Sequence, residues 1–413
     1  MKTKQYLIIG NSAAAIGCVE GIRQLDKTGA VTIVSREAHH TYSRPLISYL
    51  LSGKTDRQRM RYRDADFYET YGVAPLLGRT ALSLDPAQKT IALDDGQTLP
   101  YDKLLVATGS VPFVPPMEGL DLVSKKFTFL SLDDADALAA AVTADSRVLI
   151  VGAGLIGLKC AEGLSGQAGS LTVVDLAPQI LPSVLDEGAA ALVQAHIERQ
   201  GVRFLLSISA ARFENGAAHL TDGSTVPFDV LVLAVGVRPS VSLAREAGAA
   251  VGRGLITDEY MRTNLPGVYA AGDCTESFDI TSGERKPLAL LPNAYLQGET
   301  AGLHMAGGGK PFCTAMPMNA VGFWGLHIVS AGSYAGDAYI KCEGEHYRKL
   351  VCRDNLLQGF ILIGDVLRAG IYTALIRDRV PIDTIDFELI KDKPGLIAFS
   401  RRDRQKKLGV KPA

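Results

Sequence analysis

The chain has 413 residues, 47% of them hydrophobic, so it can bury a large core and is expected to form two or three domains. Its formal net charge of −1 argues against nucleic acid or an anionic membrane as a partner. No apolar run approaches the ~20 residues of a membrane-spanning helix, and residues 1–4 lead into a strand pattern and not into a signal peptide, so we expect a cytoplasmic protein.

The first predicted strand, residues 6–9, leads into a glycine-containing turn at 10–17. An Ala-rich helix and a second strand at 31–34 follow. This order of strand, turn, helix and strand brings backbone N–H groups and the positive end of a helix against a pyrophosphate. The N-terminal segment is therefore predicted to bind a dinucleotide.

This first turn departs from the usual glycine fingerprint. Ser12 and Ala15 stand where the second and third glycines are expected, although small residues there still allow a close approach. Ser35 stands where an acid would bind the ribose. We therefore predict that Glu37, two residues later, takes that role; the alternative is a solvated surface glutamate.

A β-meander pattern comes next and is repeated later in the chain. Residues 90–96 have the pattern of a hairpin, and the apolar run 103–107 follows it. The same order returns at 218–223 and 230–235. The sequence thus predicts an internal duplication of a βαβ unit with a meander insert. The copies cover roughly residues 4–110 and 147–239, and Pro112, Pro115 and Pro116 mark a linker between them.

The second copy carries the complete fingerprint. Gly152, Gly154 and Gly157 follow a strand at 148–151 and open a helix. Asp175 closes the next strand, where its carboxylate can accept hydrogen bonds from the adenosine ribose. An acid favours NAD(H) and disfavours NADP(H), because a carboxylate would repel a 2′-phosphate.

Six cysteines are spread along the chain without a C-x-x-C pair. Cys18 and Cys160 lie at corresponding places on the two fingerprint helices, where small buried hydrophobic residues are expected. Histidines and cysteines also lack the spacing of metal ligands. Any redox chemistry therefore needs an organic cofactor, and no metal site is predicted.

Six motifs, in order, resemble those of a known superfamily. The chain resembles the FAD- and NAD(P)-dependent pyridine nucleotide-disulfide oxidoreductases, and within them the branch of rubredoxin and ferredoxin reductases and of the flavin domain of nitrite reductases. The resemblance covers about residues 1–380 and implies an α/β fold. Two Rossmann-like three-layer dinucleotide-binding domains, as in glutathione reductase, are expected with a C-terminal α+β domain. The motifs are residues 10–17, 42–46, 107–109, 152–157, 235–239 and 268–273.

The resemblance also implies how the domains divide the chain. Residues 1–115 and 243–315 are predicted to form a discontinuous FAD-binding domain, because the chain returns to the first domain after the second. Residues 116–242 are predicted to bind NAD(H). Residues 316–413, where the pattern changes to shorter strands, are predicted to form an α+β interface domain with a basic tail, and a homodimer is compatible with it.

Cofactor-binding residues are carried over from the matching motifs. Asp273 is expected at the ribityl hydroxyls or a hydroxyl near the flavin phosphates, and Arg44 at the pyrophosphate or beside the isoalloxazine. A helix beginning near Asn293 is expected to point at the pyrimidine edge of the flavin. The predicted FAD residues are Gly10, Ser12, Ala13, Ala14, Glu37, Arg44, Pro45, Ala81, Ala107, Thr108, Gly109, Gly272, Asp273, Asn293 and Gln297. The predicted NAD residues are Gly152, Gly154, Leu155, Ile156, Gly157, Asp175, Val235, Gly236 and Val237.

Two departures from the superfamily bear on the chemistry. The segment 42–49 carries serines and no cysteine, so disulfide and thiol-peroxide chemistry are disfavoured. Lys159 stands where relatives often place a glutamate that contacts the nicotinamide. We predict Lys159 and Glu162 as the catalytic pair; the alternative is a solvated helix lysine paired one turn along.

The resulting hypothesis is an FAD-dependent NAD(P)H oxidoreductase. NADH is expected to pass a hydride to N5 of FAD, and the electrons then leave singly to a rubredoxin, a ferredoxin or an iron–sulfur partner subunit, in a reaction that can run in reverse. The alternatives are an NADH oxidase, a reductase of quinones or metal chelates, and a redox-sensing assembly module. The basic run 401–407 is expected to be solvated, with docking of an acidic electron carrier as the alternative.

Overall fold

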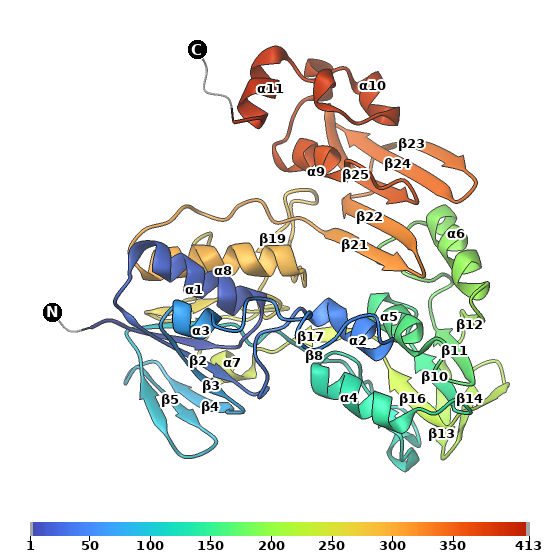
Figure 1. Ribbon diagram of the computed structural model, residues 1–413, viewed down its shortest axis with the longest axis horizontal. Helices are drawn as coiled ribbons and strands as arrows, with labels where there is room; N and C mark the ends of the chain where they lie inside the picture. The colour runs from blue at the N-terminus through green and yellow to red at the C-terminus, as the bar shows by residue number, and fades with distance from the viewer. Residues whose placement is uncertain (1–2, 410–413) are drawn as a thin grey trace. The chain divides into compact units, whose positions relative to one another are not determined.

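The computed structural model describes residues 3–409 and divides into two compact units (Figure 1). The first unit takes the chain up to Pro178, Gly201–Phe278 and Arg285–Ala315. The second takes Gln179–Gln200, Asp279–Glu284 and the chain from Met316 onward. The division into FAD-binding, NAD-binding and C-terminal domains follows the cofactors instead and stays a prediction.

The first unit contains two five-stranded parallel sheets with the same order of strands. Short runs of Val, Ile and Leu form the central strands, as expected where helices cover both faces of a parallel sheet. The first sheet has the order β18 (Val268–Ala270), β7 (Lys103–Val106), β1 (Gln5–Ile9), β2 (Ala30–Ser35) and β3 (Val73–Leu77). The second has the order β9 (Lys126–Phe127), β16 (Val230–Leu233), β10 (Arg147–Val151), β11 (Ser170–Asp175) and β12 (Val202–Leu206).

The register of these strands confirms the predicted duplication. Tyr6 pairs with Lys103 in the first sheet, as Val148 pairs with Val230 in the second. Each copy also carries a three-stranded antiparallel meander, which precedes β7 in the first copy and β16 in the second. The first meander contains the predicted hairpin at 90–96. The meanders are β4 (Ala81–Asp85), β5 (Thr90–Leu93) and β6 (Thr98–Pro100), and β13 (Ala210–Glu214), β14 (Ala217–Leu220) and β15 (Thr225–Pro227).

The two segments of the chain that pass between the copies pair with each other as an antiparallel ribbon. Strand β8 (Ser110–Pro112) pairs with β17 (Val237–Pro239). Pro112 therefore ends a short strand at the start of the predicted linker. A proline fits this edge position because it needs to donate no ladder hydrogen bond.

Helices of the first unit cover the sheets and connect their strands. They are α1 (Ala13–Leu25), α2 (Ile47–Leu51), α3 (Phe67–Thr70), α4 (Leu132–Ala141), α5 (Leu155–Leu164), α7 (Ser242–Glu246) and α8 (Leu291–Met305), with short 3-10 turns η1 (Arg44–Leu46) and η2 (Leu120–Leu122). A small hairpin joins β19 (Ser277–Phe278) to β20 (Arg285–Lys286).

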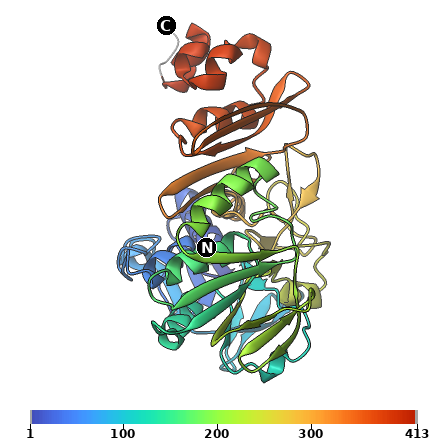
Figure 2. The ribbon, with the colours of Figure 1, turned by 90° about the vertical axis from the view of Figure 1, so that its right-hand side faces the viewer.

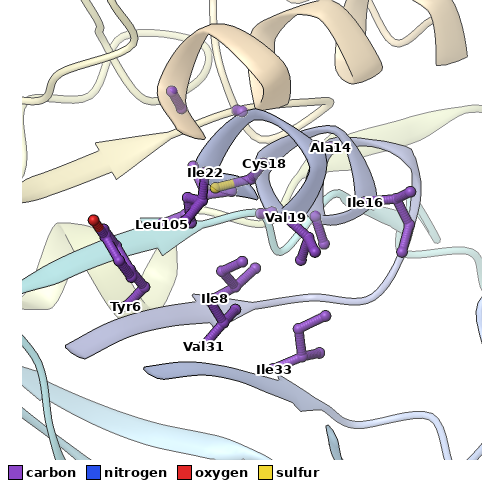
Figure 3. Close-up of a cluster of buried hydrophobic side chains, with 14 of the residues drawn as sticks. Tyr6, Ile8, Ala14, Ile16, Cys18, Val19, Ile22, Val31, Ile33 and Leu105 are labelled. Carbon is purple, nitrogen blue, oxygen red and sulfur yellow. The ribbon is translucent and has the colours of Figure 1, made fainter. Parts of the chain in front are cut away.

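The core beneath α1 follows from the apolar pattern of its sequence. Ile16, Val19 and Ile22 project from one face of α1 onto strand residues such as Ile8 and Ile33 (Figure 3). All five side chains are fully buried. Their burial fixes the helix on the sheet and so fixes where its N-terminus points.

Helices α1 and α8 lie side by side (Figure 1) and touch through glycines. A Cβ atom on Gly17 or Gly21 of α1 would overlap a backbone oxygen of α8, and one on Gly298 or Gly302 of α8 would overlap a backbone oxygen of α1. The two backbones therefore approach as closely as glycine allows.

The second unit has an antiparallel sheet with helices. Its helices α9, α10 and α11 are drawn in red beside the orange and red strands in Figure 2. Buried side chains such as Phe360 and Tyr372 form its core. The prediction of an α+β pattern after Met316 is confirmed. The sheet order is β21 (Met318–Phe323), β22 (Leu326–Gly332), β25 (Leu356–Ile363), β24 (His346–Arg353) and β23 (Asp337–Glu343), and the helices and turns are α6 (Glu187–Glu198), α9 (Ala369–Arg377), η3 (Ile382–Thr384), α10 (Phe387–Asp392), η4 (Leu396–Ala398) and α11 (Arg401–Lys407).

Within residues 3–409, no helix combines the length and the apolar character needed to cross a bilayer.

The helix crossing generates a stability prediction. We expect Gly302→Ala to lower the free energy of unfolding by about 1–3 kcal/mol, because its Cβ would overlap the Cys18 carbonyl oxygen and push the helices apart. Urea unfolding measures the change. Gly370→Ala is the matched control: the site lies in α9, a Cβ there meets nothing within 4 Å, and the change should be neutral or stabilise by about 0.5–1 kcal/mol. Equal losses in both variants would contradict the close approach.

Candidate functional site

The first glycine turn carries the chain from β1 to the start of α1. Gly10 has φ +118°, a conformation that disfavours any side chain, and a Cβ there would overlap the Ala107 carbonyl oxygen. Ser12 is the N-cap of α1 and makes no side-chain cap hydrogen bond. The first amides of the helix, those of Ala13 and Ala14, are thus left to an oxygen from another molecule.

Each fingerprint glycine of the second turn has a separate physical role. Gly152 has φ +115° and sits against the Ala234 carbonyl oxygen, as Gly10 does against Ala107. A Cβ on Gly157 would overlap the oxygen of Gly152, so this glycine lets the helix close on the turn. Gly154 caps α5 without a side-chain acceptor, and a Cβ there would meet nothing within 4 Å. These glycines form a cradle that fits a pyrophosphate.

Two of the longer helices, α4 and α6, are capped by their own side chains. Ser131 and Asp134 form a capping box at the start of α4, and Asp186 caps α6. Helix α8, like α1 and α5, begins with a residue that offers no cap, Leu290, and has no acid in its first turn. Among the described helices of ten or more residues, the three without a side-chain cap are therefore those that the sequence places at cofactors.

Asp175 lies at the end of β11 and is held by backbone amides. Its Oδ2 accepts a hydrogen bond from the Ala153 amide at 2.6 Å, and its Oδ1 accepts one from the Ala177 amide at 2.7 Å. The carboxylate is therefore oriented beside the glycine turn before any nucleotide arrives. This is the position from which an acid reaches ribose hydroxyls.

Glu37, Tyr42 and Arg44 form a polar network after β2. The Tyr42 hydroxyl donates to Glu37 Oε2 at 2.5 Å and accepts from the Leu132 amide at 3.0 Å, and Arg44 pairs with Glu37 Oε1. Burial raises the pKa of Tyr42, so the hydroxyl stays a donor at neutral pH. Ser35, at the place of Asp175, donates to the Glu37 carbonyl oxygen at 3.1 Å. The network fixes Glu37 beside the first turn.

Asp273 lies at the turn after β18, against the strand that follows β7. Ser110 Oγ donates to Asp273 Oδ2 at 3.3 Å, and Thr108 Oγ1 donates to the Ser240 carbonyl oxygen at 2.6 Å. Burial raises the pKa of Asp273, while Ser110 and Arg44 lower it. Desolvation is the largest of these effects, so the carboxyl keeps a proton to a higher pH than usual.

Gln297 holds this turn in place from helix α8. Its Oε1 accepts from the Gly272 amide at 2.7 Å, and its Nε2 donates to Ser277 Oγ at 2.6 Å. Gly272 has φ +84° and packs close to Ala14 of α1. The side chain of Asn293 is buried one turn earlier on α8. The structure thus brings Gly10, Ala107, Asp273 and the starts of α1 and α8 to one place.

The remaining predicted positions lie on elements near the two turns. Pro45 belongs to η1, and Ala81 begins β4 and packs on an apolar cluster that includes Ile9 and Val34. Gly109 and Gly236 have positive φ angles and open surroundings, and Val235 and Val237 flank Gly236. Leu155 and Ile156 form the first turn of α5. Contacts of these residues with a cofactor stay predictions.

Lys159 is held in a half-buried ionic cluster between α5 and α2. Its ammonium pairs with Glu162 and lies 4.4 Å from the centroid of the Tyr49 ring. Lys54 lies 3.5 Å from the other oxygen of Glu162. The side chain of Lys159 is 14% exposed, which differs from the solvated lysine that was the alternative.

Sequence reasoning missed Tyr42, Ser110 and Tyr49 as functional candidates. Tyr42 belongs to the matched motif 42–46, so its position alone could have suggested a role. Ser110 and Tyr49 gave no signal, because their importance comes from contacts with Asp273 and Lys159 across the fold.

Cysteine placement agrees with the sequence analysis. Cys18 and Cys160 are fully buried, and burial raises the pKa of both thiols. All six cysteines are free thiols. Among residues 3–409, no group of three or more His, Cys, Asp or Glu side chains is arranged to hold a metal ion.

Comparison with known proteins decides the family. The model of the pyridine nucleotide-disulphide oxidoreductase family matches residues 4–298. The chain belongs to this family. The chain is 32% identical to the NADH-dependent phenylglyoxylate dehydrogenase subunit epsilon of Aromatoleum evansii, with 92% of each chain aligned. The nitrite reductase [NAD(P)H] of Bacillus subtilis is 34% identical over 88% of this chain, which spans about half (46%) of that protein.

A solved structure confirms the fold of the family. The putidaredoxin reductase in its covalent complex with putidaredoxin superposes with a TM-score of 0.87 over 99% of both chains, at 21% identity. The protein is thus an FAD-dependent NAD(P)H oxidoreductase of the family, with two Rossmann-like domains. The glycine cradles, the uncapped helix starts and the oriented acids Glu37 and Asp175 fit FAD at the first turn and NAD(H) at the second.

Tyr42 generates a prediction about cofactor retention. We expect Tyr42→Phe to weaken FAD binding at least several-fold and to destabilise the protein by about 1–3 kcal/mol, because Glu37 loses a donor and the Leu132 amide loses its acceptor. Release of FAD on dilution, followed by its fluorescence, measures the affinity.

Tyr334→Phe is the matched control. It also removes a hydroxyl that donates at 2.7 Å to a backbone oxygen, that of Val184, but within the second unit. Its FAD affinity should equal that of the unmodified protein. If both variants bound FAD normally, Tyr42 would have only a structural role.

Proposed function

We propose that the protein oxidises NADH and passes the electrons to an acidic iron–sulfur protein, either a carrier such as a rubredoxin or ferredoxin or a partner subunit. When bound, FAD accepts two electrons as a hydride and can release them one at a time. The single observation that carries the proposal is the segment 42–49. It lies at the predicted flavin site and contains no thiol to receive the electrons.

The surroundings of Cys274 support the same interpretation. Cys274 follows Asp273 directly, but it is fully buried, and its thiol donates toward the Ala271 and Val106 carbonyl oxygens at 3.3 and 3.5 Å. Burial raises its pKa to about 11. A neutral, buried thiol is a poor nucleophile and a poor redox centre.

The names of the relatives favour a protein acceptor. The relative that matches over almost its full length is one subunit of a dehydrogenase, and the Bacillus subtilis relative is a nitrite reductase about twice as long as the aligned segment. The first is, by its name, one subunit of a larger enzyme, and in the second the aligned segment is about half of a longer reductase. We therefore propose a partner subunit and a free carrier protein equally as the electron acceptor.

The residues of the second turn explain how NADH is chosen and placed. Gly154 and the first amides of α5 are proposed to receive the pyrophosphate, and Asp175 the ribose hydroxyls. Lys159 is proposed to lie near the nicotinamide, where its ammonium would stabilise negative charge on the reduced flavin. Glu162 and Tyr49 hold the ammonium in position.

An anaerobic stopped-flow experiment tests the proposal. NADH should bleach the flavin band, and a rubredoxin or a 2[4Fe–4S] ferredoxin added second should restore it faster than dissolved oxygen does. If oxygen restored the band as fast as every iron–sulfur protein, the protein would be an NADH oxidase. If only quinones restored it, a small-acceptor reductase would replace the proposal.

Nucleotide choice depends on Asp175. We expect kcat/KM for NADH to exceed that for NADPH by about tenfold or more, because the carboxylate repels a 2′-phosphate. The double change Asp175→Ala with Leu176→Arg should narrow or invert the preference, since Leu176 is 72% exposed beside the acid and an arginine there can pair with the phosphate. Leu176→Ala is the control and should keep the preference for NADH. Equal efficiencies in the unmodified protein would show that Asp175 does not face the ribose.

Electron counting tests the absence of a thiol centre. Anaerobic titration with NADH should consume two electrons per FAD, and four would reveal a second redox group.

Cys274→Ser should retain FAD and electron transfer and cost about 0.5–3 kcal/mol of stability. Because the thiol pKa is raised, no thiolate–flavin charge-transfer band is expected below about pH 9 in the oxidised protein. Loss of electron transfer in Cys274→Ser with FAD still bound would refute the proposal.

A further inference from the structure

A concentrated positive surface lies next to the predicted flavin segment. Residues 54–63, which we name the basic loop, contain five cationic side chains and one carboxylate, although the whole chain is almost neutral. Arg57 and Arg59 are 54% and 77% exposed, and Lys54 is 52% exposed. Four of these cations have a carboxylate partner, so the charge that can attract an acidic protein is that of Arg61 and of the exposed pairs that such a protein can replace. The cations of the loop are Lys54, Arg57, Arg59, Arg61 and Arg63.

The basic loop is fixed to the body of the first unit. Met60 is a buried anchor with 1% exposure. Arg57 pairs with Asp136 of α4 at 2.6 Å, and Arg63 pairs with Glu20 of α1 at 2.6 Å. The loop therefore presents its charges in a set arrangement, which lowers the entropic cost of docking.

Backbone hydrogen bonds join the loop to the segment that carries Arg44. The Ser43 amide donates to the Met60 oxygen at 2.8 Å, and the Tyr62 amide donates to the Thr41 oxygen at 3.1 Å. Tyr42 and Arg61 form an antiparallel bridge. A protein seated on the loop would thus be one hydrogen-bonded strand away from the residues predicted to contact FAD.

Two cations of the loop point their charge at solvent. Among the described residues, Arg59 has one ion-pair partner, Asp56, a half-exposed neighbour in the same loop at 3.3 Å. Arg61 is exposed, and within residues 3–409 no carboxylate pairs with it. Exposed pairs of this kind contribute little to stability, so a partner's carboxylates can replace them at little cost.

We propose that the basic loop is the docking surface for the acidic iron–sulfur protein that takes electrons from the flavin. This inference rests on the proposed function and adds the place where the acceptor binds. Complementary charge there would speed the encounter and orient the iron–sulfur centre toward the Arg44 segment. The basic residues Arg401 and Arg402 of the second unit are the competing surface, and the test separates the two.

Charge reversal tests the surface in the FAD-loaded protein. The double change Arg59→Glu with Arg61→Glu should raise the KM for a 2[4Fe–4S] ferredoxin about tenfold or more at low ionic strength and should flatten the dependence of the rate on salt. NADH oxidation with ferricyanide, a small acceptor, should keep its kcat and its KM for NADH. The double change Arg401→Glu with Arg402→Glu alters the net charge equally and should leave the ferredoxin KM within about twofold.

The outcomes separate this inference from the proposed function. If the loop variant reduces ferredoxin with unchanged KM and salt dependence, the docking surface is wrong, while the proposed function stands. A raised KM in the tail variant alone would move docking to Arg401 and Arg402. If the unmodified protein reduces ferricyanide but no iron–sulfur protein, both proposals fail. Flavin content and thermal unfolding of each variant show whether a loss comes from misfolding.

Discussion

The close crossing of α1 and α8 is the constraint on which the site depends. The two helices begin almost 280 residues apart in the chain, at Ala13 and Leu291, and they meet because glycines on both remove the side chains between them. The crossing places Gly298 of α8 against the backbone of Ala14, and Gln297 on the same helix fixes Gly272 and with it Asp273. The entropic cost of closing a loop rises only slowly with its length, so the dense packing of the two helix backbones can offset it.

The same helix face serves a different purpose in the second copy. Gly17 and Gly21 of α1 correspond to Lys159 and Gly163 of α5 in the duplicated sequence. In α1 both positions face α8, whereas in α5 a Cβ on Gly163 would lie 3.0 Å from Leu51 of α2. Lys159 reaches toward Tyr49 of that same helix. The departure from the family at position 159 is therefore part of how α5 packs on the segment that follows Arg44.

Local signals predicted the fold well and the site only in part. Strands, fingerprint turns and the duplication follow from apolar runs and glycines that act over a few residues, and the register of both sheets agrees with them. Asp175 could be placed because strand, helix and acid occur in one short stretch. The roles of Tyr42 and Tyr49 could not, because each depends on a partner from a distant element. The strand that ends at Pro112 could not be predicted, because its partner strand lies more than a hundred residues later.

The segment between Tyr42 and Arg63 joins the parts of the proposed electron path. Its first residues hold Glu37 and the start of α4, and its last residues form the basic loop. Between them, Lys54 shares Glu162 with Lys159 of α5, the helix that begins at the NAD cradle. Burying a carboxylate such as Glu162 costs free energy unless it is paired, so the two lysines are needed on either side of it. One carboxylate thereby links α5 to the loop proposed to receive the acceptor, so the proposed sites of electron entry and exit both contact the segment 42–63.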